Sequence, residues 1–278
     1  MTVTQSIERL VKVSVGLSDA DLDKPYAWEE YNEDGLRFAL LTAHHQLRDA
    51  HAHVAAMRLG AGQPFTEAQR ILAPVHEAYR ALTGALAGTS LADLDAAPPN
   101  EQWPLREVLK HILEAEKGFL AAIEIGLEMV RAGQPSIPLP SAEAFRAKRH
   151  PPEDPSGTRA DALNALFRSH VAILRALDGV TDAELDTPSF FWEDKGYPVR
   201  FRMHRFEEHL RQHTIQVDKT LVAIGHPPTE AERLVRNLHT ALAGVESVAS
   251  GTAAGREMLD RCAASIDGIT VEVQRILA

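Results

Sequence analysis

The feature that most restricts how this chain folds is a repeat within its own sequence. The segment LSDADLDKPYAW at 17–28 is similar to VTDAELDTPSFFW at 180–192. After one extra residue in the second segment, the two copies stay in register as far as His76 and His239. A match this long indicates that one structural unit occurs twice. The alternative is an unrelated helical array whose similarity reflects only a composition rich in Ala and Leu.

The order of the copies indicates how they assemble. A weaker match pairs 105–125 with 255–276, so the N-terminal segment resembles the second half of the central segment and the C-terminal segment resembles its first half. Two helices at either terminus cannot bury their apolar stripes alone, so we expect the termini to meet. The predicted domains are a continuous unit over 63–227 and a second unit assembled from 1–62 and 228–278.

The periodicity of apolar residues predicts an all-α protein. Apolar side chains recur at helical spacing in long segments rich in Ala, Leu, Glu and Arg, and alternating strand-like runs are absent. The stretch Gln134–Gly157 is too rich in Pro for a helix and is predicted to be a long crossover connection. The predicted helices are 3–17, 36–59, 66–87, 104–132, 159–178, 199–224, 229–249 and 255–277.

Charge and cysteine content exclude several classes of function. The formal net charge is −10 and the basic residues are scattered, which disfavours a nucleic-acid partner. Cys262 is the only cysteine, so a disulfide within the chain and a Cys-rich zinc site are excluded. The start of the chain lacks a signal-peptide pattern, and no apolar run approaches a membrane span. We therefore expect a cytoplasmic protein, without membrane contact, whose metal ligands are His or carboxylates.

Three polar side chains align on the predicted helix 199–224. His209, His213 and Gln216 follow one another at i, i+4 and i+7, beside an apolar row. Two imidazoles at this spacing can bind one divalent ion. Such pairs also occur by chance on solvated helix faces, and the spacing alone favours that interpretation.

A third imidazole is predicted to point into the protein. His111 lies between Val108 and Ile112 on an apolar stripe of the helix 104–132. A buried imidazole without a partner is costly, so His111 is either a hydrogen-bonded core residue or a metal ligand. Facing the pair on the later helix, it would complete three nitrogen donors and leave coordination positions open to water or substrate.

Two motifs lie on either side of the predicted crossover: Trp103-x-x-Arg106-Glu107-x-x-x-His111 and His209-x-x-x-His213-x-x-Gln216. With these motifs, the central unit resembles the DinB-like superfamily from end to end. Members of that superfamily are four-helix bundles with a crossover between helices two and three, and many bind a divalent metal through one His of helix two and two of helix four. The resemblance implies His111, His209 and His213 as ligands, with Zn or Ni as the favoured ion.

Two further residues are assigned roles around these ligands. Gln216 is expected to orient a ligand rather than to bind the metal, because amides are poor donors to such ions. Glu114, three residues after His111, is a candidate general base or fourth ligand. A solvated helical carboxylate is the more common case for Glu114.

The second copy has lost the ligands. Gln46, Ala50 and Arg261 stand where the central unit has His209, His213 and His111, so this copy is expected to be metal-free. A separate metal hypothesis involves a face of the helix 36–59 that carries His45, Asp49 and His53. Against it, no other helix is identified that completes the site, which favours an exposed histidine-rich face.

The resemblance implies a class of function but no single reaction. The superfamily includes thiol S-transferases, mycothiol-dependent isomerases, a thiol-sulfoxide synthase accessory domain and members without an assigned activity. We expect a metal-dependent thiol S-transferase that acts on small electrophiles, with a low-molecular-weight thiol as cosubstrate and a metal that activates the thiolate or water. The alternatives are a non-catalytic module that binds a ligand or partner, and a scaffold without metal. In either case we expect a monomer that forms an internal pseudo-dimer, or a weak homodimer.

Overall fold

The structure is a computed structural model that describes residues 2–134, 138–149, 151–191 and 195–278. The prediction of an all-α chain is confirmed, because the described elements are helices apart from two strands of two residues each. The helices are α1 (Val3–Ser14), α2 (Asp19–Leu22), α3 (Arg37–Gly60), α4 (Glu67–Ala85), α5 (Leu91–Asp95), α6 (Leu105–Arg131), α7 (Ala142–Lys148), α8 (Arg159–Leu177), the 3-10 helix η1 (Asp182–Asp186), α9 (Val199–Ala223), α10 (Glu230–Ala249) and α11 (Arg256–Leu277). The strands β1 (Pro188–Ser189) and β2 (Tyr197–Pro198) pair antiparallel.

The chain divides into two compact units. The terminal unit comprises Met1–Pro64, Arg80–Thr89 and His226–Ala278, and the central unit comprises Phe65–Tyr79 and Ser90–Gly225. Helix α4 contributes residues to both. The division into two domains of common origin stays a prediction.

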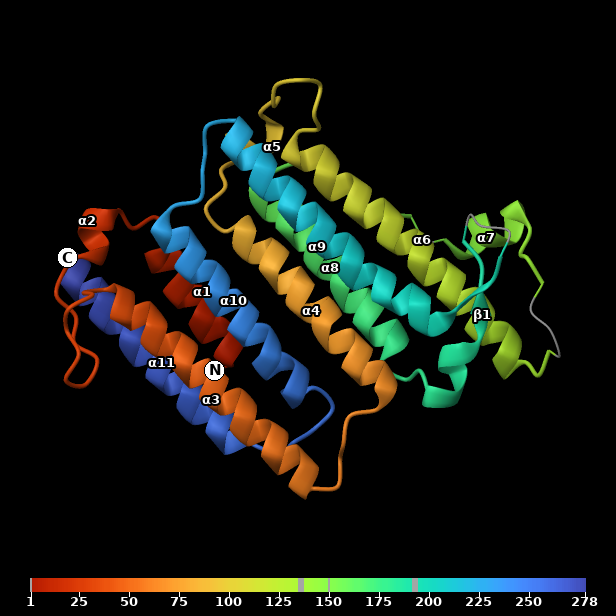
Figure 1. The fold of residues 1–278 in the computed structure, drawn as a ribbon, viewed down its shortest axis with the longest axis horizontal. Coiled ribbons are helices and arrows are strands. Elements are labelled where there is room, and N and C mark those ends of the chain that lie inside the picture. The colour runs from red at the N-terminus through yellow and green to blue at the C-terminus, as the bar shows by residue number, and fades with distance from the viewer. Residues whose placement is uncertain (1, 135–137, 150, 192–194) are drawn as a thin grey trace. The chain divides into compact units, whose positions relative to one another are not determined.

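The terminal unit is built around four helices from the two ends of the chain. Helix α1 packs against α11, and α3 packs against both α10 and α11 (Figure 1). Each helix supplies fully buried apolar residues to one core, among them Leu10, Leu47, Leu242 and Ile266. Burial of such side chains stabilises the fold by roughly 1.5–3 kcal/mol each. Neither terminal pair of helices therefore leaves its apolar face in water.

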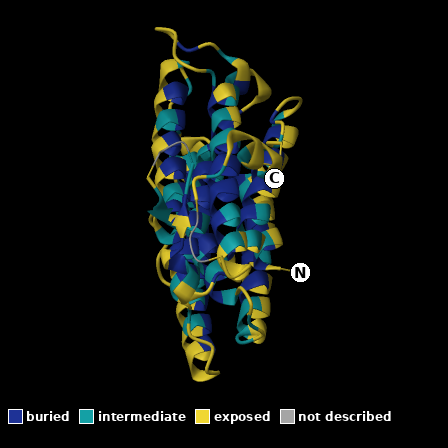
Figure 2. Ribbon diagram, turned by 90° about the vertical axis from the view of Figure 1, so that its right-hand side faces the viewer, coloured by how far each residue is buried: buried dark blue, intermediate teal, exposed yellow. Residues whose placement is uncertain are grey.

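The central unit is organised around α6, which packs against α9 and α8. Helix α4 joins this set in the same unit, since Glu77 pairs with Arg211 of α9 and His76 contacts His170 of α8. The buried residues lie on the inner faces of the helices (Figure 2). Leu109, Ile112 and other α6 residues are fully buried, which holds α6 firmly against its neighbours.

The connection after α6 corrects one expectation. The stretch Gln134–Gly157 was predicted to contain no helix, yet α7 occupies Ala142–Lys148. The sequence AEAFRAK contains no Pro, and Ser141 caps its first turn by accepting a hydrogen bond from the Ala144 N–H. The prolines thus restrict the flanks of this connection and not its middle. Residues 135–137 and 150 of the stretch lie outside the described residues.

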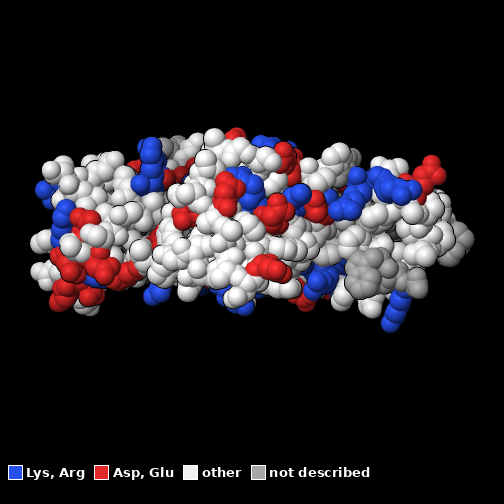
Figure 3. Space-filling view, turned by 90° about the horizontal axis from the view of Figure 1, so that it is seen from above, with Lys and Arg blue, Asp and Glu red and all other residues white. Residues whose placement is uncertain are grey.

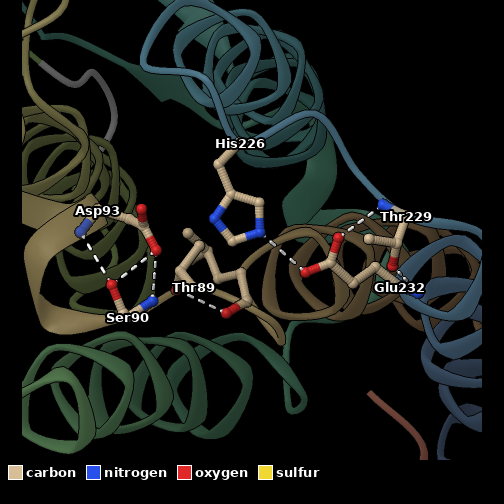
Figure 4. Close-up of polar contacts among 7 residues, drawn as sticks. Thr89, Ser90, Asp93, His226, Thr229 and Glu232 are labelled. Carbon is tan, nitrogen blue, oxygen red and sulfur yellow. Dashed lines mark hydrogen bonds and ion pairs between the residues drawn. The ribbon is translucent and has the colours of Figure 1, made fainter. Parts of the chain in front are cut away.

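Short-range capping explains where several helices begin. Before α10, the Thr229 hydroxyl accepts from the Glu232 N–H, and the Glu232 carboxylate accepts from the Thr229 N–H (Figure 4). His226 contacts the same carboxylate at 3.1 Å. Ser90 and Asp93 form the corresponding box before α5. Such boxes satisfy backbone donors that the helix itself leaves unpaired.

The surface shows no large basic region on the face drawn in Figure 3, where Lys and Arg alternate with Asp and Glu. Among the described residues, no helix combines the length and the apolar character that a bilayer crossing requires.

Candidate metal centre

Two of the three candidate imidazoles lie one turn apart on α9. The helix begins after Pro198, whose fixed backbone suits a helix start, and Met203, Phe206 and Leu210 bury its apolar face. His209 and His213 flank this face and are only 6% and 5% exposed. The interpretation of this pair as ordinary solvated surface residues is therefore wrong.

The third imidazole comes from α6 and meets the pair. The Nε2 atom of His209 lies 3.3 Å from Nε2 of His111 and 3.1 Å from Nε2 of His213. The ring centroids are separated by 4.3 to 5.2 Å. Potential ligand atoms of all three residues lie within 4.8 Å of one another. Helix packing thus brings together residues that are about one hundred positions apart in the chain.

The donor set fits a divalent metal ion. Two imidazole nitrogens bound at about 2.05 Å in a tetrahedral site are roughly 3.3 Å apart, close to the separations seen here. Three neutral nitrogens are typical of sites that hold Zn²⁺ or a similar borderline ion and leave one position open. No other group of three His, Cys, Asp or Glu side chains within the described parts of the chain meets in this way.

Gln216 determines which ring nitrogen of His213 carries the proton and which has the lone pair. Its Oε1 lies 2.8 Å from Nδ1 of His213, and an amide oxygen only accepts, so Nδ1 carries the proton and donates it. The lone pair of His213 is then on Nε2, which faces the other two rings. Gln216 is therefore placed to orient a ligand, as a partner of metal-bound histidine typically does.

The surroundings keep the α9 imidazoles uncharged. Burial, together with the neighbouring His213, His111 and Arg205, lowers the pKa of His209 to about 3. Burial also lowers the pKa of His213, against the opposing effect of its hydrogen bond from Nδ1 to Gln216. Both rings are neutral at physiological pH, which is the protonation state that metal binding requires. The Nδ1 atom of His209 is buried without a hydrogen-bond partner among the described residues.

A pocket of about 1060 Å³ opens onto the three rings. Trp103 lies at this pocket with its ring 5.3 Å from that of His111 and is 46% exposed. Phe119 packs against His209 from the other side, with 5.6 Å between the ring centroids. The imidazoles are therefore accessible to a ligand although two of them are nearly buried.

Glu114 is not brought to this pocket. It lies on α6 one turn after His111, but it is not among the pocket-lining residues, and its backbone carbonyl accepts a hydrogen bond from Arg149 of the crossover. Its role as a base or ligand stays a prediction without support from this arrangement.

The sequence interpretation missed other lining residues of α9. Arg202, Arg205, Gln212 and Lys219 line the same pocket as the imidazoles. Arg205, Gln212 and Lys219 stand three or four residues from His209 or Gln216, and Arg202 stands seven residues before His209. These spacings place all four on one side of the helix, which is a signal that the sequence already contains.

The ligand positions of the terminal unit are different. Ala50 is fully buried, and the Oε1 atom of Gln46 is buried without a hydrogen-bond partner among the described residues. The side chain of Arg261 is 69% exposed. On α3, His53 pairs with Asp49 at the surface, and the ring of His45 lies 5.6 Å from that of Trp28 at a tilt of 52°. Neither group forms a three-residue metal cluster in the part of the chain that the structure describes.

Comparison with known proteins identifies the family. A family model of the DinB superfamily matches residues 75–217, just over half of the chain, and this range contains all three imidazoles. The chain belongs to the DinB superfamily. Proteins of this superfamily often bind a metal. Neither the curated proteins nor the solved structures contain a match to this DinB protein.

Proposed function

We propose that this DinB protein binds a divalent metal ion, with zinc or nickel favoured, through His111, His209 and His213, and acts on a small molecule in the adjoining pocket. The observation that carries the proposal is the convergence of three Nε2 atoms on one point at the pocket wall. Membership of a superfamily that often binds metal supports it.

The chain's own residues would prepare this chemistry. Gln216 keeps the proton of His213 on Nδ1, and burial keeps His209 neutral, so both lone pairs are available without loss of a proton. Trp103 and Phe119 place apolar rings beside His111 and His209, with 5.3 and 5.6 Å between the ring centroids. A bound divalent ion would supply Lewis acidity, which lowers the pKa of a thiol or water toward neutrality.

The reaction that we favour is transfer of a low-molecular-weight thiol to a small electrophile. A pocket of about 1060 Å³ is at the upper end of the usual range for small-molecule sites, which leaves room for a thiol and a second substrate together. The choice of thiol transfer among the possible reactions rests on the resemblance to the superfamily. Glu114 has no part in the proposal, because it does not line the pocket.

The test begins with the metal. Protein purified without a chelator or a nickel column should contain about one divalent ion per chain by elemental analysis. The metal-loaded protein is then assayed with small thiols and small electrophiles. Absence of bound metal would refute the site, whereas bound metal without any turnover would refute the enzymatic part.

A non-catalytic binding module is the second candidate. It is favoured by the terminal unit, which keeps a packed bundle although Gln46, Ala50 and Arg261 replace the three imidazoles. In such a module the metal would serve stability, and loss of a ligand would lower the melting temperature strongly. An enzyme would lose activity with little change in melting temperature.

A further inference from the structure

The pocket continues along α9 well beyond the imidazoles. Arg205 precedes His209 by one turn, and Lys219 follows His213 by six residues. At 1.5 Å per residue, Arg205 lies roughly 6 Å from His209 and Lys219 lies roughly 9 Å from His213 along the helix axis. A ligand that reaches the imidazoles therefore has room to extend toward either end of the pocket.

The end of the pocket before His209 combines aromatic rings with arginines. The Cζ atom of Arg202 lies 5.6 to 5.8 Å from the ring centroids of Phe191, Tyr197 and Phe201. The Cζ atom of Arg205 lies 5.9 Å from the centroid of Phe119. We call this part of the pocket the aromatic end; it consists of Phe119, Phe191, Tyr197, Phe201, Arg202 and Arg205.

Phe119 connects the aromatic end to the imidazoles. Its ring centroid is 5.4 Å from that of Phe191 and 5.6 Å from that of His209. Both pairs are T-shaped, with 71° and 86° between the ring planes, so Phe119 and Phe191 together form an apolar corner beside the imidazoles. Gly118 allows the Phe191 ring to lie close to α6, since a Cβ there would be 2.4 Å from that ring.

The charge of the pocket differs from that of the whole chain. Its described lining residues include the three cations Arg202, Arg205 and Lys219 and the two acids Glu101 and Glu208. The whole chain, by contrast, carries a net charge of −10. Arg205 donates to Glu208 through Nη1 at 2.6 Å. A guanidinium has five N–H donors, and the other donors of Arg205 bond to no described residue.

Helix packing gives no reason for the Arg205 cation. At the position related to Arg205 by the predicted repeat, the terminal unit has the buried Thr42 in a packed helix. Arg202 differs, because it is fully buried and its guanidinium lies near the rings of Phe191, Tyr197 and Phe201. The ligand argument therefore rests on Arg205.

We propose that the aromatic end binds an organic anion, with its carboxylate on Arg205 and its flat apolar body against Phe119 and Phe191. The anion would be the electrophilic substrate, with its reacting atom about one helical turn from the carboxylate; this role rests on the proposed function. Arg205 would then determine specificity by a charge-assisted, planar contact that a neutral substrate cannot make.

Binding to the metal-free protein tests this without depending on the metal. Benzoate and its neutral analogue benzamide are titrated by calorimetry, first into the unsubstituted protein and then into Arg205→Gln and Lys219→Gln. We expect benzoate to bind at least about tenfold more tightly than benzamide and Arg205→Gln to remove this preference, because a charged hydrogen bond is lost. Lys219→Gln should change benzoate affinity by less than about twofold, since Lys219 lies at the other end.

Two further measurements distinguish the possible failures. Circular dichroism melting of Arg205→Gln and of Arg205→Lys shows whether each variant folds, and the lysine variant should retain part of the preference for benzoate. Equal affinity for benzoate and benzamide, or loss of the preference in Lys219→Gln instead of Arg205→Gln, would overturn the proposal. Failure of the metal site would appear separately in elemental analysis and would leave this preference unchanged.

Discussion

The two units of the chain use the same scaffold contacts around different interiors. In the terminal unit, Arg37 at the start of α3 pairs with Asp23 and with Glu230 of α10. In the central unit, Arg200 at the start of α9 pairs with Asp186 and with Glu67 of α4. These two sets of residues occupy corresponding positions in the repeat.

The interiors differ at the positions where the central unit has its site. One turn of α9 carries His209 and His213, whereas the corresponding turn of α3 carries Gln46 and Ala50. Ion pairs at the helix starts thus occur in both units, whereas the three candidate ligands occur in the central unit. We therefore predict that changes to the candidate site and changes to these ion pairs have separate effects.

The largest expected effect is the loss of metal on removal of one imidazole. His209→Ala should reduce the bound metal from about one ion per chain to nearly none, because two imidazoles do not hold the ion tightly. Elemental analysis after dialysis measures this. Gln46→Ala, the matched change in the terminal unit, should leave the metal content unaltered, and a loss of metal in that variant would break the comparison.

The next effect concerns a buried carboxyl group that only the central unit has. Burial raises the pKa of Glu116 on α6 to about 8, although Lys117 opposes this, and the corresponding residue of α11 is the fully buried Ile266. The folded state therefore keeps a proton that the unfolded chain releases near pH 4.5, so stability is lost as the pH rises from about 4.5 to about 8.

Glu116→Gln should remove this dependence. Relative to pH 5, the variant should lose less stability at pH 9 than the unsubstituted protein, by up to about 4 kcal/mol. Urea unfolding at both pH values measures the difference. The exposed Glu107 of the same helix provides the control, since Glu107→Gln should leave the pH dependence intact. An unchanged slope in Glu116→Gln would show that its carboxyl group is ionised in the folded protein.

A smaller effect is expected from the partner of His213. Gln216→Ala removes the oxygen that accepts the Nδ1 proton, and the metal affinity should fall about 10- to 100-fold. Competition with a chelating indicator measures this affinity. Gln212→Ala changes a pocket residue of the same type that makes no such hydrogen bond in the described structure and should change the affinity little. Equal losses in both variants would assign the effect to the pocket as a whole.

The smallest effects should be those on the shared scaffold. Arg37→Met and Arg200→Met each remove a largely solvated pair of salt bridges, so each should lower the melting temperature by about one or two degrees. The effects should add in the double variant if the pairs are independent. A much larger effect in one unit would show that the scaffold contacts are not equivalent. Differential scanning calorimetry distinguishes these outcomes.

Much of the fold was predictable because helices depend on local spacing. The positions of α3, α6, α9 and α10 follow from apolar periodicity, and the start of α10 also follows from its cap, Thr229 with Glu232. The short helices α2, α5 and α7 were not predicted, since a helix of one or two turns carries too few apolar residues to show a period. The strands β1 and β2, with two residues each, are similarly too short to show alternation.

The long helices, the family and the three candidate imidazoles were predictable from the sequence alone, because each depends on residues a few positions apart or on a motif read in order. Tertiary structure decided that His111 meets His209 and His213 within one cluster, that Glu114 stays away from the pocket, and that Phe119 joins the arginines of α9 to the imidazoles. These outcomes depend on how α6 is rotated against α9. Rotation is set by the packing of the whole core and not by the spacing within either helix.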